Sequence, residues 1–344
     1  MQADSGISVI LCCYNSVKRL NKTLKALANQ KFDLEIPVEI IVVDNASTDH
    51  TAEYSKTIWE SLNTHNKIRN VHQPIPGLGN ARNAGIKEAQ YSYILFCDDD
   101  NWLFPNYIND GYNILNNNAN IGACGGIGLP VFEIDKPNWF DEYAESFAVG
   151  SQEIVKENGK QLSLYGAGLL IKKEVLNKLE NCGYTQFLKD RTGNKLSSSG
   201  DTELTNAIVL LGYDLHYSEN LKFFHYLPKE RLTKSYLERL FVAFGTDGPL
   251  RNLYHAHICT SFIHKLIKYW HFHFFLSIFR LVKYYIHPPK KQGRKIFFLW
   301  SKAYIKELIA LKSNYGTLLA NIQSVASVEF KRENLYPIEL EGVA

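Results

Sequence analysis

Apolar runs and helix-periodic segments alternate along the first hundred residues of the chain. Four runs are short and apolar enough for buried parallel strands: residues 7–12, 38–43, 68–72 and 91–97. Helical spacing marks the segments between them: residues 17–29, a segment capped by Ser47 or Thr48-Asp49 that runs to about residue 62, and residues 80–89. Strands that alternate with helices predict a parallel sheet with helices on both faces.

The ends of these strands carry much of the candidate chemistry. Ligands of parallel sheets bind outside the carboxyl ends of the strands. That rule places four groups along one rim: Tyr14-Asn15, Asp44-Asn45, the loop 74–82 and Asp98-Asp99-Asp100. Asp44 is suited to accept hydrogen bonds from a base or ribose; alternatively, it forms a turn and helix cap with Asn45, Ser47 and Asp49.

Three consecutive aspartates, Asp98, Asp99 and Asp100, follow the fourth predicted strand. Carboxylates this close repel one another unless a cation neutralises them. Mg²⁺ and Mn²⁺ prefer oxygen ligands, and Mg²⁺ is usually held by one or two carboxylates together with substrate phosphates. The triplet therefore predicts a seat for a metal–diphosphate complex, with an acidic surface turn as the alternative.

A glycine-containing loop precedes the third predicted helix. Gly77 and Gly79 let the backbone approach a ligand, and Arg82 supplies a forked donor for phosphate. The helix start near Asn80 adds a favourable potential for anions. Arg82 stands where a dinucleotide fingerprint has its third glycine, so a nicotinamide enzyme is weakly supported.

A second set of polar residues lies further along the chain. Asp201 opens a predicted helix, where a carboxylate stays ionised and suits a general base; alternatively, it is a helix cap with Glu203 as a surface neighbour. His225 ends a predicted strand and is either a third metal ligand or a residue packed beside the sheet. Lys229 and Arg231 either neutralise a leaving diphosphate or are ordinary solvated charges.

Charge is distributed unevenly along the 344 residues. The composition, 45% hydrophobic and 21% charged, is that of a globular protein, and six cysteines without metal-ligand spacing are expected to be reduced core residues. Residues 1–247 carry 24 Lys and Arg against 30 Asp and Glu, whereas residues 248–306 carry 11 against none. This asymmetry points to an anionic partner for one segment only.

Residues 258–287 are predicted to be helical and rich in aromatic side chains. Basic residues and histidines fall on two stripes, which predicts a break near residues 275–278: His257, His264, Lys268 and His271 on one, Arg280, Lys283 and His287 on the other. The 11 residues between Lys268 and Arg280 are fewer than the roughly 20 that span a membrane. Pro288-Pro289 is expected to end the helix before the basic residues 290–295 and the apolar stretch 296–300. A peripheral membrane surface is the favoured partner; packing on the sheet or in an oligomer is the alternative, and nucleic-acid binding is disfavoured.

The order of motifs resembles glycosyltransferase family 2, whose members have the GT-A fold. The motifs are Ser8-Val9-Ile10 with Tyr14-Asn15, and residues 42–49, 77–85 and 96–100. The resemblance covers roughly residues 7–230. It implies an inverting transferase that uses a nucleotide-diphosphate sugar, with a UDP-sugar favoured, and a divalent metal, Mn²⁺ or Mg²⁺.

The resemblance also implies a role for each matching residue. Asp44 would contact the nucleotide base, and Tyr14 and Asn15 would line the base pocket. The remaining expected donor contacts are Asn45, Gly79, Arg82, Asp98 and Asp99, with Asp98 at the ribose or a metal-bound water and Asp99 ranked below its neighbours. Asp100 and His225 would bind the metal. Asp201 would be the general base, although Gly200 stands where many members carry a glutamate. Contacts to the diphosphate or acceptor are expected from Gly168, Glu203, Lys229 and Arg231.

We therefore expect a GT-A catalytic domain over residues 1–231, with a nucleotide-binding part (about 1–127) and an acceptor part (about 128–231), followed by a helical extension over 232–344. Loops 128–165 and 184–199 are expected to set specificity. The expected reaction is sugar transfer to a saccharide or lipid-linked acceptor in bacterial-type surface glycan or lipid-linked oligosaccharide synthesis, in the cytoplasm at the inner face of the cell membrane. Two alternatives are a non-catalytic membrane-docked scaffold and a sugar-nucleotide pyrophosphorylase. The second would need a glycine-rich basic loop where Cys12-Cys13-Tyr14-Asn15 stands.

Overall fold

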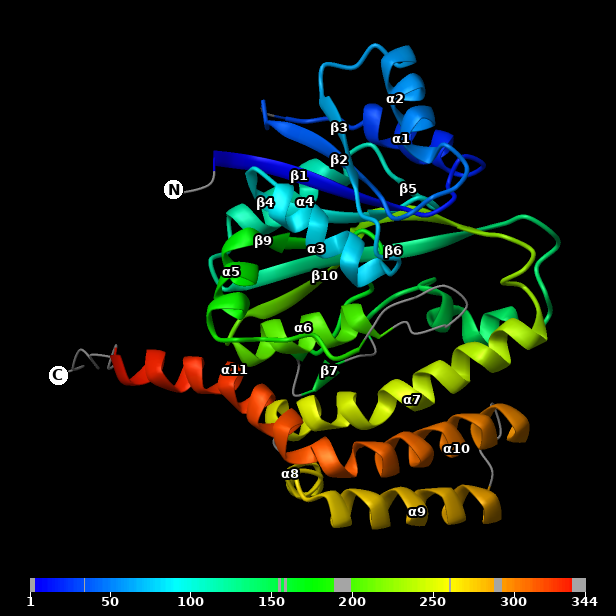
Figure 1. Cartoon of the computed structure of the whole chain (residues 1–344), viewed down its shortest axis with the longest axis vertical. Helices are drawn as coiled ribbons and strands as arrows, with labels where there is room; N and C mark the ends of the chain where they lie inside the picture. Colours follow the sequence, from blue (N-terminus) through cyan, green and yellow to red (C-terminus); the bar gives the residue numbers. More distant parts are fainter. Residues whose placement is uncertain are drawn as a thin grey trace.

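The computed structural model describes residues 4–33, 35–153, 156–157, 160–188, 199–259, 261–287 and 293–335. Its main sheet has eight strands: β1 (Asp4–Cys13), β2 (Val38–Asp44), β3 (Lys67–His72), β4 (Tyr91–Asp98), β5 (Asn101–Leu103), β6 (Ile121–Phe132), β9 (Leu170–Lys172) and β10 (Asp214–Leu227). The strand order is β3-β2-β1-β4-β9-β6-β10-β5 (Figure 1). β7 (Lys156–Glu157) and β8 (Lys160–Gln161) form a separate two-stranded sheet.

The first four strands confirm the predicted parallel sheet. β1 pairs in parallel with β2 on one side and β4 on the other, and β2 pairs in parallel with β3. Six helices accompany the sheet: α1 (Leu20–Ala28), α2 (Thr51–Ser61), α3 (Leu78–Glu88), α4 (Tyr107–Asn116), α5 (Lys173–Asn181) and α6 (Gly200–Leu210). The predicted cap of α2 is wrong, because His50 occupies the N-cap position and no side chain caps it. The Asp49 carboxylate instead accepts hydrogen bonds from Val17 N and Thr51 Oγ1.

The short strand β9 joins the two halves of the sheet. It runs antiparallel to both β4 and β6, with Ile171 opposite Ile94 on one side and Ala123 on the other. The Leu169 carbonyl accepts a hydrogen bond from Phe96 N at 2.9 Å, so the residues that precede β9 are held against β4. This pairing brings the glycines at 166 and 168 to the rim where β4 ends.

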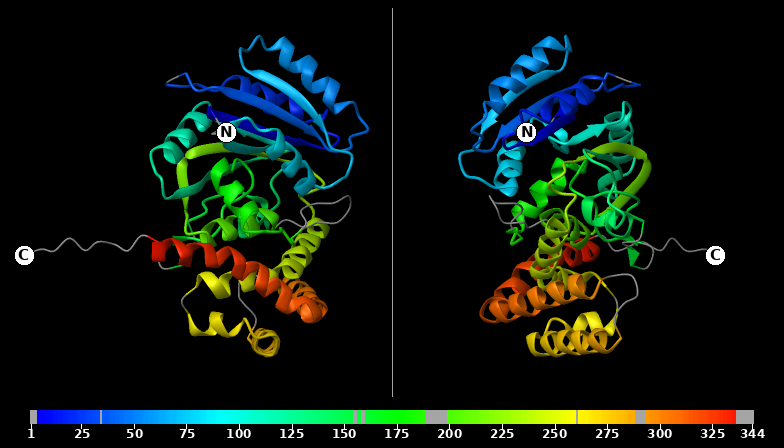
Figure 2. Two further views of the ribbon diagram at one scale, coloured as in Figure 1. Left: turned by 60° about the vertical axis from the view of Figure 1, so that its left-hand side comes forward. Right: turned by 90° about the vertical axis from the view of Figure 1, so that its right-hand side faces the viewer.

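A helical extension follows the sheet. It comprises α7 (Lys234–Ile258), α8 (Phe262–Leu266), α9 (Trp270–Ile286), α10 (Arg294–Ala310) and α11 (Tyr315–Leu335), and the 3₁₀ segments of the chain are Phe140–Phe147 and Leu311–Asn314. The helices form layers in which α7 lies next to the sheet domain and α9 lies farthest from it (Figures 1 and 2). The α/β architecture with a helical carboxyl-terminal region is therefore confirmed.

The predicted break near residues 275–278 is wrong, because α9 runs through them without interruption. The turn comes earlier, where Ile267 is buried and Trp270 Nε1 donates to the Leu308 carbonyl at 2.8 Å. These contacts anchor the start of α9 on α10. The expected helix stop at Pro288-Pro289, the basic residues 290–292 and most of the loop 184–199 lie outside the described residues. No helix in the described part of the chain combines the length and apolarity needed to cross a membrane.

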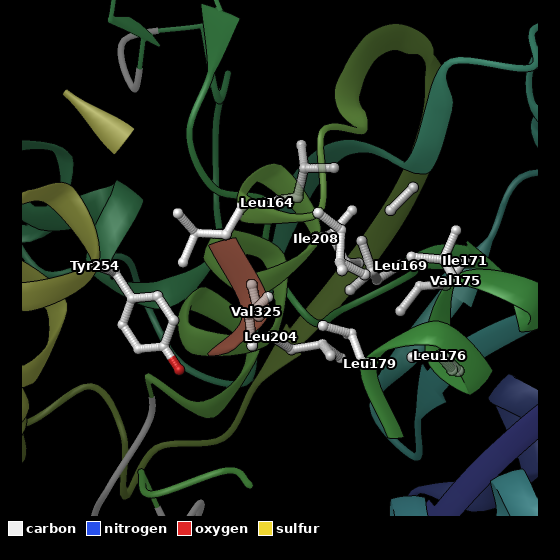
Figure 3. Close-up of a cluster of buried hydrophobic side chains, with 14 of the residues drawn as sticks. Leu164, Leu169, Ile171, Val175, Leu176, Leu179, Leu204, Ile208, Tyr254 and Val325 are labelled. Atoms are coloured by element: carbon white, nitrogen blue, oxygen red, sulfur yellow. The ribbon is translucent and has the colours of Figure 1, made fainter. Parts of the chain in front are cut away.

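The largest core cluster extends from the sheet into the extension (Figure 3). Leu204 and Ile208 of α6 lie in it together with Tyr254 of α7 and Val325 of α11, all of them buried. Each fully buried aliphatic side chain contributes about 1.5–3 kcal/mol relative to exposure. α6 is therefore fixed between the sheet and the extension, and this helix carries Asp201 at its start.

Candidate active site

The carboxyl ends of β1, β2 and β4 meet at one rim. The register sets Cys13 opposite Asp44 and Cys12 opposite Asp98. Asn45 N donates to the Cys13 carbonyl at 2.8 Å, which joins the loops that follow β1 and β2. The structure therefore brings together the residues after the three strands, as the parallel pattern predicts.

The loop after β1 is held in a fixed shape by its neighbours. Asn15 has a left-handed backbone (φ 50°), its N–H donates to Ser47 Oγ at 3.0 Å, and its Oδ1 accepts from Thr48 N at 2.8 Å. The Asn15 amide oxygen is thus engaged within the protein. Tyr14, in contrast, is 53% exposed and leaves its ring available to a ligand.

Asp44 and Asn45, at the end of β2, have different partners. Asp44 Oδ1 accepts from Ser47 N at 3.2 Å, and its Oδ2 lies 3.8 Å from His72 Nδ1. The buried Asn45 donates from Nδ2 to the Ile75 carbonyl at 2.7 Å and accepts at Oδ1 from Gly77 N at 2.7 Å. Asn45 therefore positions the glycine loop, and we leave it out of the proposed ligand contacts.

Arg82 projects from α3 into the interior of the site. Its side chain is buried, and its guanidinium lies 5.0 Å from the centre of the Phe96 ring. Gly77 precedes the helix with φ 136°, a conformation that favours glycine. Gly79 has no other atom within 4 Å of the position a Cβ would take, so the backbone there is open to a ligand.

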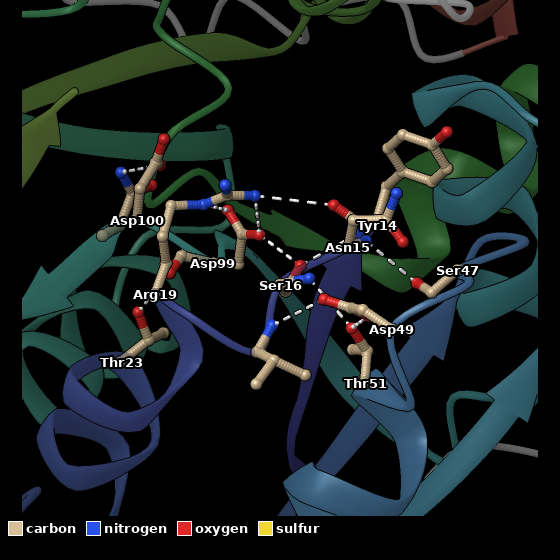
Figure 4. A network of polar contacts seen from close by, with 12 residues as sticks. Tyr14, Asn15, Ser16, Arg19, Thr23, Ser47, Asp49, Thr51, Asp99 and Asp100 are labelled. Carbon is tan, nitrogen blue, oxygen red and sulfur yellow. Dashed lines mark hydrogen bonds and ion pairs between the residues drawn. The ribbon is translucent and has the colours of Figure 1, made fainter. Parts of the chain in front are cut away.

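Asp99 and Asp100, which follow β4, have different partners. Asp99 Oδ2 accepts from Arg19 Nη2 at 2.6 Å and from Ser16 Oγ, and Thr23 Oγ1 donates to the Asp99 carbonyl at 2.8 Å (Figure 4). Burial and the neighbouring Asp100 raise the pKa of Asp99, and the bonds from Arg19 and Ser16 oppose that rise. Asp99 therefore ties the end of β4 to the loop after β1.

Asp100 is the centre of a second polar cluster. Its Oδ1 accepts from Asn101 Nδ2 at 3.1 Å and lies 3.7 Å from His225 Nε2, and its Oδ2 lies 3.1 Å from Arg231 Nη1. His225 reaches this point because β10 pairs with β5, which sets His225 opposite Asn101. Burial lowers the pKa of Arg231, but the combined fields of Asp100, Tyr236, Asp99 and Asp98 oppose that effect and raise the pKa overall.

The donor set suits a divalent cation only in part. Asp100 Oδ1 and His225 Nε2 provide two neighbouring ligand atoms of types that Mn²⁺ accepts. Among the described residues, no group of three or more His, Cys, Asp or Glu side chains could hold a metal. Mg²⁺ characteristically keeps waters and takes its other ligands from substrate phosphates. The two residues therefore fit a metal that a diphosphate helps to coordinate, but not a cage made by the protein alone.

Asp201 lies where the two halves of the sheet meet. Its Oδ2 accepts from Gly166 N at 2.7 Å and its Oδ1 from Thr202 N at 2.7 Å. A Cβ added to Gly166 would lie 2.5 Å from Arg82 Nη2 and 3.0 Å from Asp201 Oδ2. The Arg82 guanidinium and the Asp201 carboxylate therefore both lie close to Gly166, so the predicted phosphate donor and the predicted base share one small space.

The remaining predicted contacts take different positions. Gly168 has φ 71°, and its carbonyl accepts from Tyr107 Oη at 2.7 Å, which fixes the turn before β9. Glu203 is fully buried and accepts from Phe187 N, Leu188 N and Tyr254 Oη. It therefore anchors residues 187–188 to α6 and α7, and we leave it out of the proposed acceptor contacts. Lys229 is exposed at the end of β10.

Sequence reasoning missed three kinds of residue. Arg19 and Ser16 hold Asp99, although nothing in the local pattern after β1 indicates that partner. Gly166 lies two positions before Gly168, and nothing in the sequence sets it apart as a neighbour of Arg82. Arg251 of α7 belongs to a stripe with Asp247 and His255 at intervals of four, a helical spacing visible in the sequence. Burial lowers the pKa of Arg251, while Asp247, Tyr304 and Asp201 oppose the change.

Known proteins share these motifs. A family model described as "Glycosyl transferase family 2" matches residues 8–180, about half of the chain. The putative glycosyltransferase EpsH of Bacillus subtilis is 32% identical over 102 residues, which cover 30% of this chain and 28% of that protein. Glycosyltransferase GlyA of Streptococcus pneumoniae is 27% identical over 188 residues, which cover 52% of this chain and 26% of that protein. The chain thus spans little more than a quarter of either relative.

Two further similarities involve TarS of Staphylococcus aureus. This poly(ribitol-phosphate) beta-N-acetylglucosaminyltransferase is 33% identical over 103 residues, which cover 30% of this chain and 18% of that protein. The crystal structure of TarS residues 1–349 in complex with UDP aligns with 98% of this chain and 94% of that chain, at 16% identity and a TM-score of 0.49.

Proposed function

This chain belongs to glycosyl transferase family 2, and we propose that it transfers a sugar from a nucleotide-diphosphate sugar to an acceptor hydroxyl, with inversion at the anomeric carbon. The observation that carries the proposal is that the Arg82 guanidinium and the Asp201 carboxylate both lie beside Gly166. A phosphate-binding guanidinium and a carboxylate base are the two groups that the reaction needs close together. The similarity to an N-acetylglucosaminyltransferase supports a UDP-sugar donor and surface glycan synthesis.

Asp201 acts as the general base in this proposal. It accepts the proton of the acceptor hydroxyl as that oxygen attacks the anomeric carbon, a role that contributes typically 10²–10⁴-fold in rate. Backbone N–H groups of Gly166 and Thr202 donate to its two oxygens and fix their direction. A single base is sufficient for inversion, because no nucleophilic carboxylate is required.

The donor lies along the rim of β1, β2 and β4. The exposed ring of Tyr14 and the Asp44 carboxylate face the nucleoside, with Asp98 at the ribose, and Arg82 binds the phosphates. Asp100 and His225 would hold a divalent cation, which when bound would stabilise negative charge on the leaving diphosphate. Arg231 and Lys229 are the cations of this chain that would approach the same oxygens.

We further propose that the protein works as a peripheral protein at the inner face of the cell membrane. One stripe of α9 exposes four apolar side chains at helical spacing: Phe275, Phe279, Val282 and Ile286. Phe275 and Phe279 are 67% and 66% exposed, and Arg280 and Lys283 stand among them. Aromatic and cationic side chains on one helix suit an interface that carries anionic lipids. A lipid-linked or surface-glycan acceptor would be met there.

Binding of a nucleotide panel tests the donor site. UDP, GDP, CDP and TDP are titrated by calorimetry with Mn²⁺, Mg²⁺ or chelator, using the native chain, Asp100→Ala and the control Glu60→Ala, which removes an exposed carboxylate of α2. We expect metal-dependent binding of one nucleotide, lost in Asp100→Ala and retained in Glu60→Ala. If no nucleotide binds under any condition, the non-catalytic scaffold replaces the transferase as the better account. Release of pyrophosphate from the donor would instead indicate a sugar-nucleotide pyrophosphorylase.

A further inference from the structure

A cavity of about 350 Å³ lies within the helical extension, between α7, α9 and α10. Its volume is in the lower part of the range of roughly 300–1,000 Å³ that is typical of small-molecule sites. Five aromatic side chains contribute to its wall: Phe241, Tyr284, Phe297, Trp300 and Tyr304. The catalytic residues named above do not line it, so its contents are not explained by the transfer reaction.

One buried hydroxyl in the wall of the cavity lacks a hydrogen-bond partner among the described residues. Ser301 lines the cavity and is only 4% exposed, and its Oγ has no hydrogen-bond partner among the described residues. A buried hydroxyl without a partner is unfavourable, because its lost hydrogen bonds to water are not replaced. That cost disappears when a ligand that enters the cavity supplies an acceptor or donor.

The charge of Arg280 indicates an anionic ligand for the cavity. Arg280 lines it and is exposed, and it forms no ion pair with any other described residue. Residues 248–306 contain no acidic side chain, and none of the residues that line the cavity is acidic. A guanidinium beside aromatic walls is suited to an anionic group, phosphate above all, that is attached to an apolar body.

The two faces of α9 connect the cavity with the proposed membrane surface. Ser277, Leu281 and Tyr284 face the cavity, whereas Phe275, Phe279 and Ile286 are exposed about half a turn away around the helix. α9 is also the layer farthest from the sheet (Figure 2). Only α9 would therefore separate the cavity from an apolar chain at the membrane surface.

We infer that this cavity binds a lipid phosphate, with one apolar chain between the aromatic walls and the phosphate paired with Arg280. The Ser301 hydroxyl donates to an oxygen of the same head group. The site differs from surface docking, because it recognises one molecule with both a chain and a phosphate. It does not depend on the transfer reaction or on a nucleotide in the rim.

Calorimetric titration of the full chain with monomeric dodecyl phosphate tests the inference, with dodecanol and inorganic phosphate as comparison ligands. We expect one saturable site for dodecyl phosphate and at least tenfold weaker binding of either fragment. Arg280→Gln should weaken binding at least tenfold, whereas Lys283→Gln, which removes a neighbouring exposed cation outside the cavity, should change it less than twofold. Ser301→Val should weaken it severalfold. The comparison of Arg280→Gln with Lys283→Gln tests the inference even if Ser301→Val fails to fold. Arg280 is exposed, so its replacement leaves the packing intact.

Three results would overturn the inference. Equal weakening by Arg280→Gln and Lys283→Gln would indicate general attraction to a basic surface. Equal binding of inorganic phosphate would show that the chain is not recognised, and unsaturable uptake would indicate adsorption of a detergent. Nucleotide binding measured on the same samples separates this outcome from failure of the proposed transferase, since the rim and the cavity share no residue.

Discussion

Replacing Gly166 with alanine adds one methyl group at the point where the proposed donor and acceptor sites meet. The backbone at Gly166 does not have a positive φ, so alanine introduces no backbone strain there. The new Cβ would lie 2.5 Å from Arg82 Nη2 and 3.0 Å from both Cβ and Oδ2 of Asp201. The effect of the substitution therefore falls on the two proposed functional side chains.

The size of the effect follows from these distances. Ordinary van der Waals contact of a Cβ begins at 3.4 Å, so the Arg82 guanidinium must move by about 1 Å and the Asp201 carboxylate by a few tenths of an ångström. Misplacement of reacting groups by about 1 Å costs on the order of 10²-fold in rate. The Arg82 side chain ends in a flexible group that moves at little cost, so the free energy of unfolding should fall by less than about 1–3 kcal/mol.

The assay is release of nucleoside diphosphate from the sugar donor that the binding panel selects, together with chemical denaturation of the same preparations. We expect kcat/KM of Gly166→Ala to fall about 10²-fold, with a folded protein. Gly316→Ala is the matched control, because that glycine lies in α11 and has no atom within 4 Å of the added methyl. Activity of Gly166→Ala within twofold of the native value would refute the proposal that Arg82 and Asp201 act together in the transfer reaction beside Gly166.

Three further predictions concern the base, the metal position and the extension. Asp201→Asn should lower the transfer rate by 10²–10⁴-fold while nucleotide binding is retained; a normal transfer rate would exclude Asp201 as the base. Arg231→Gln removes the cation that lies 3.1 Å from Asp100, and it should tighten Mn²⁺ binding without nucleotide roughly tenfold, measured by calorimetry, because a charge-assisted bond of about 1.5–3 kcal/mol no longer competes; unchanged affinity would contradict this competition. Burial lowers the pKa of His273 from 6.5 to about 4, so the unfolded chain binds a proton first as pH falls below 6.5. Between pH 7 and 4.5 this group should remove about 2 kcal/mol from the free energy of unfolding, and His273→Gln should show a correspondingly shallower dependence in denaturant titrations.

The first half of the fold and the rim could be read from the sequence because both depend on local pattern. Runs of β-branched and apolar residues predict the strands, and the rule for parallel sheets then places Tyr14, Asp44 and Asp98 together. The three-residue strand β9 gives no such signal, because it is too short for a period and pairs antiparallel between strands that precede it by tens of residues. The position of Gly166 follows from that pairing and was missed for the same reason.

Side-chain partners were harder to predict than backbone elements. Asp99 and Arg19 are 80 positions apart, and only the packed loop brings them together. The buried state of Glu203 depends on α7 and residues 187–188, which meet it from two directions. The predicted helix break near 275–278 is wrong for a similar reason. The charges that suggested a break lie on one continuous helix, α9, and the start of that helix is set by the hydrogen bond from Trp270 to the Leu308 carbonyl. Long-range packing decides each of these features, and no local window contains it.

The layering of the helical extension limits the distance between α9 and Asp201. From α9 through α10 and α7 to α6 there are three helix-to-helix steps, each of about 8–10 Å between axes, so α9 and the helix that begins beside Asp201 are separated by up to roughly 30 Å. When α9 lies on a bilayer, the proposed base, Asp201, would therefore stand up to roughly 30 Å from the lipid head groups. A glycan that has already grown by several units would span that distance more readily than a bare lipid head group.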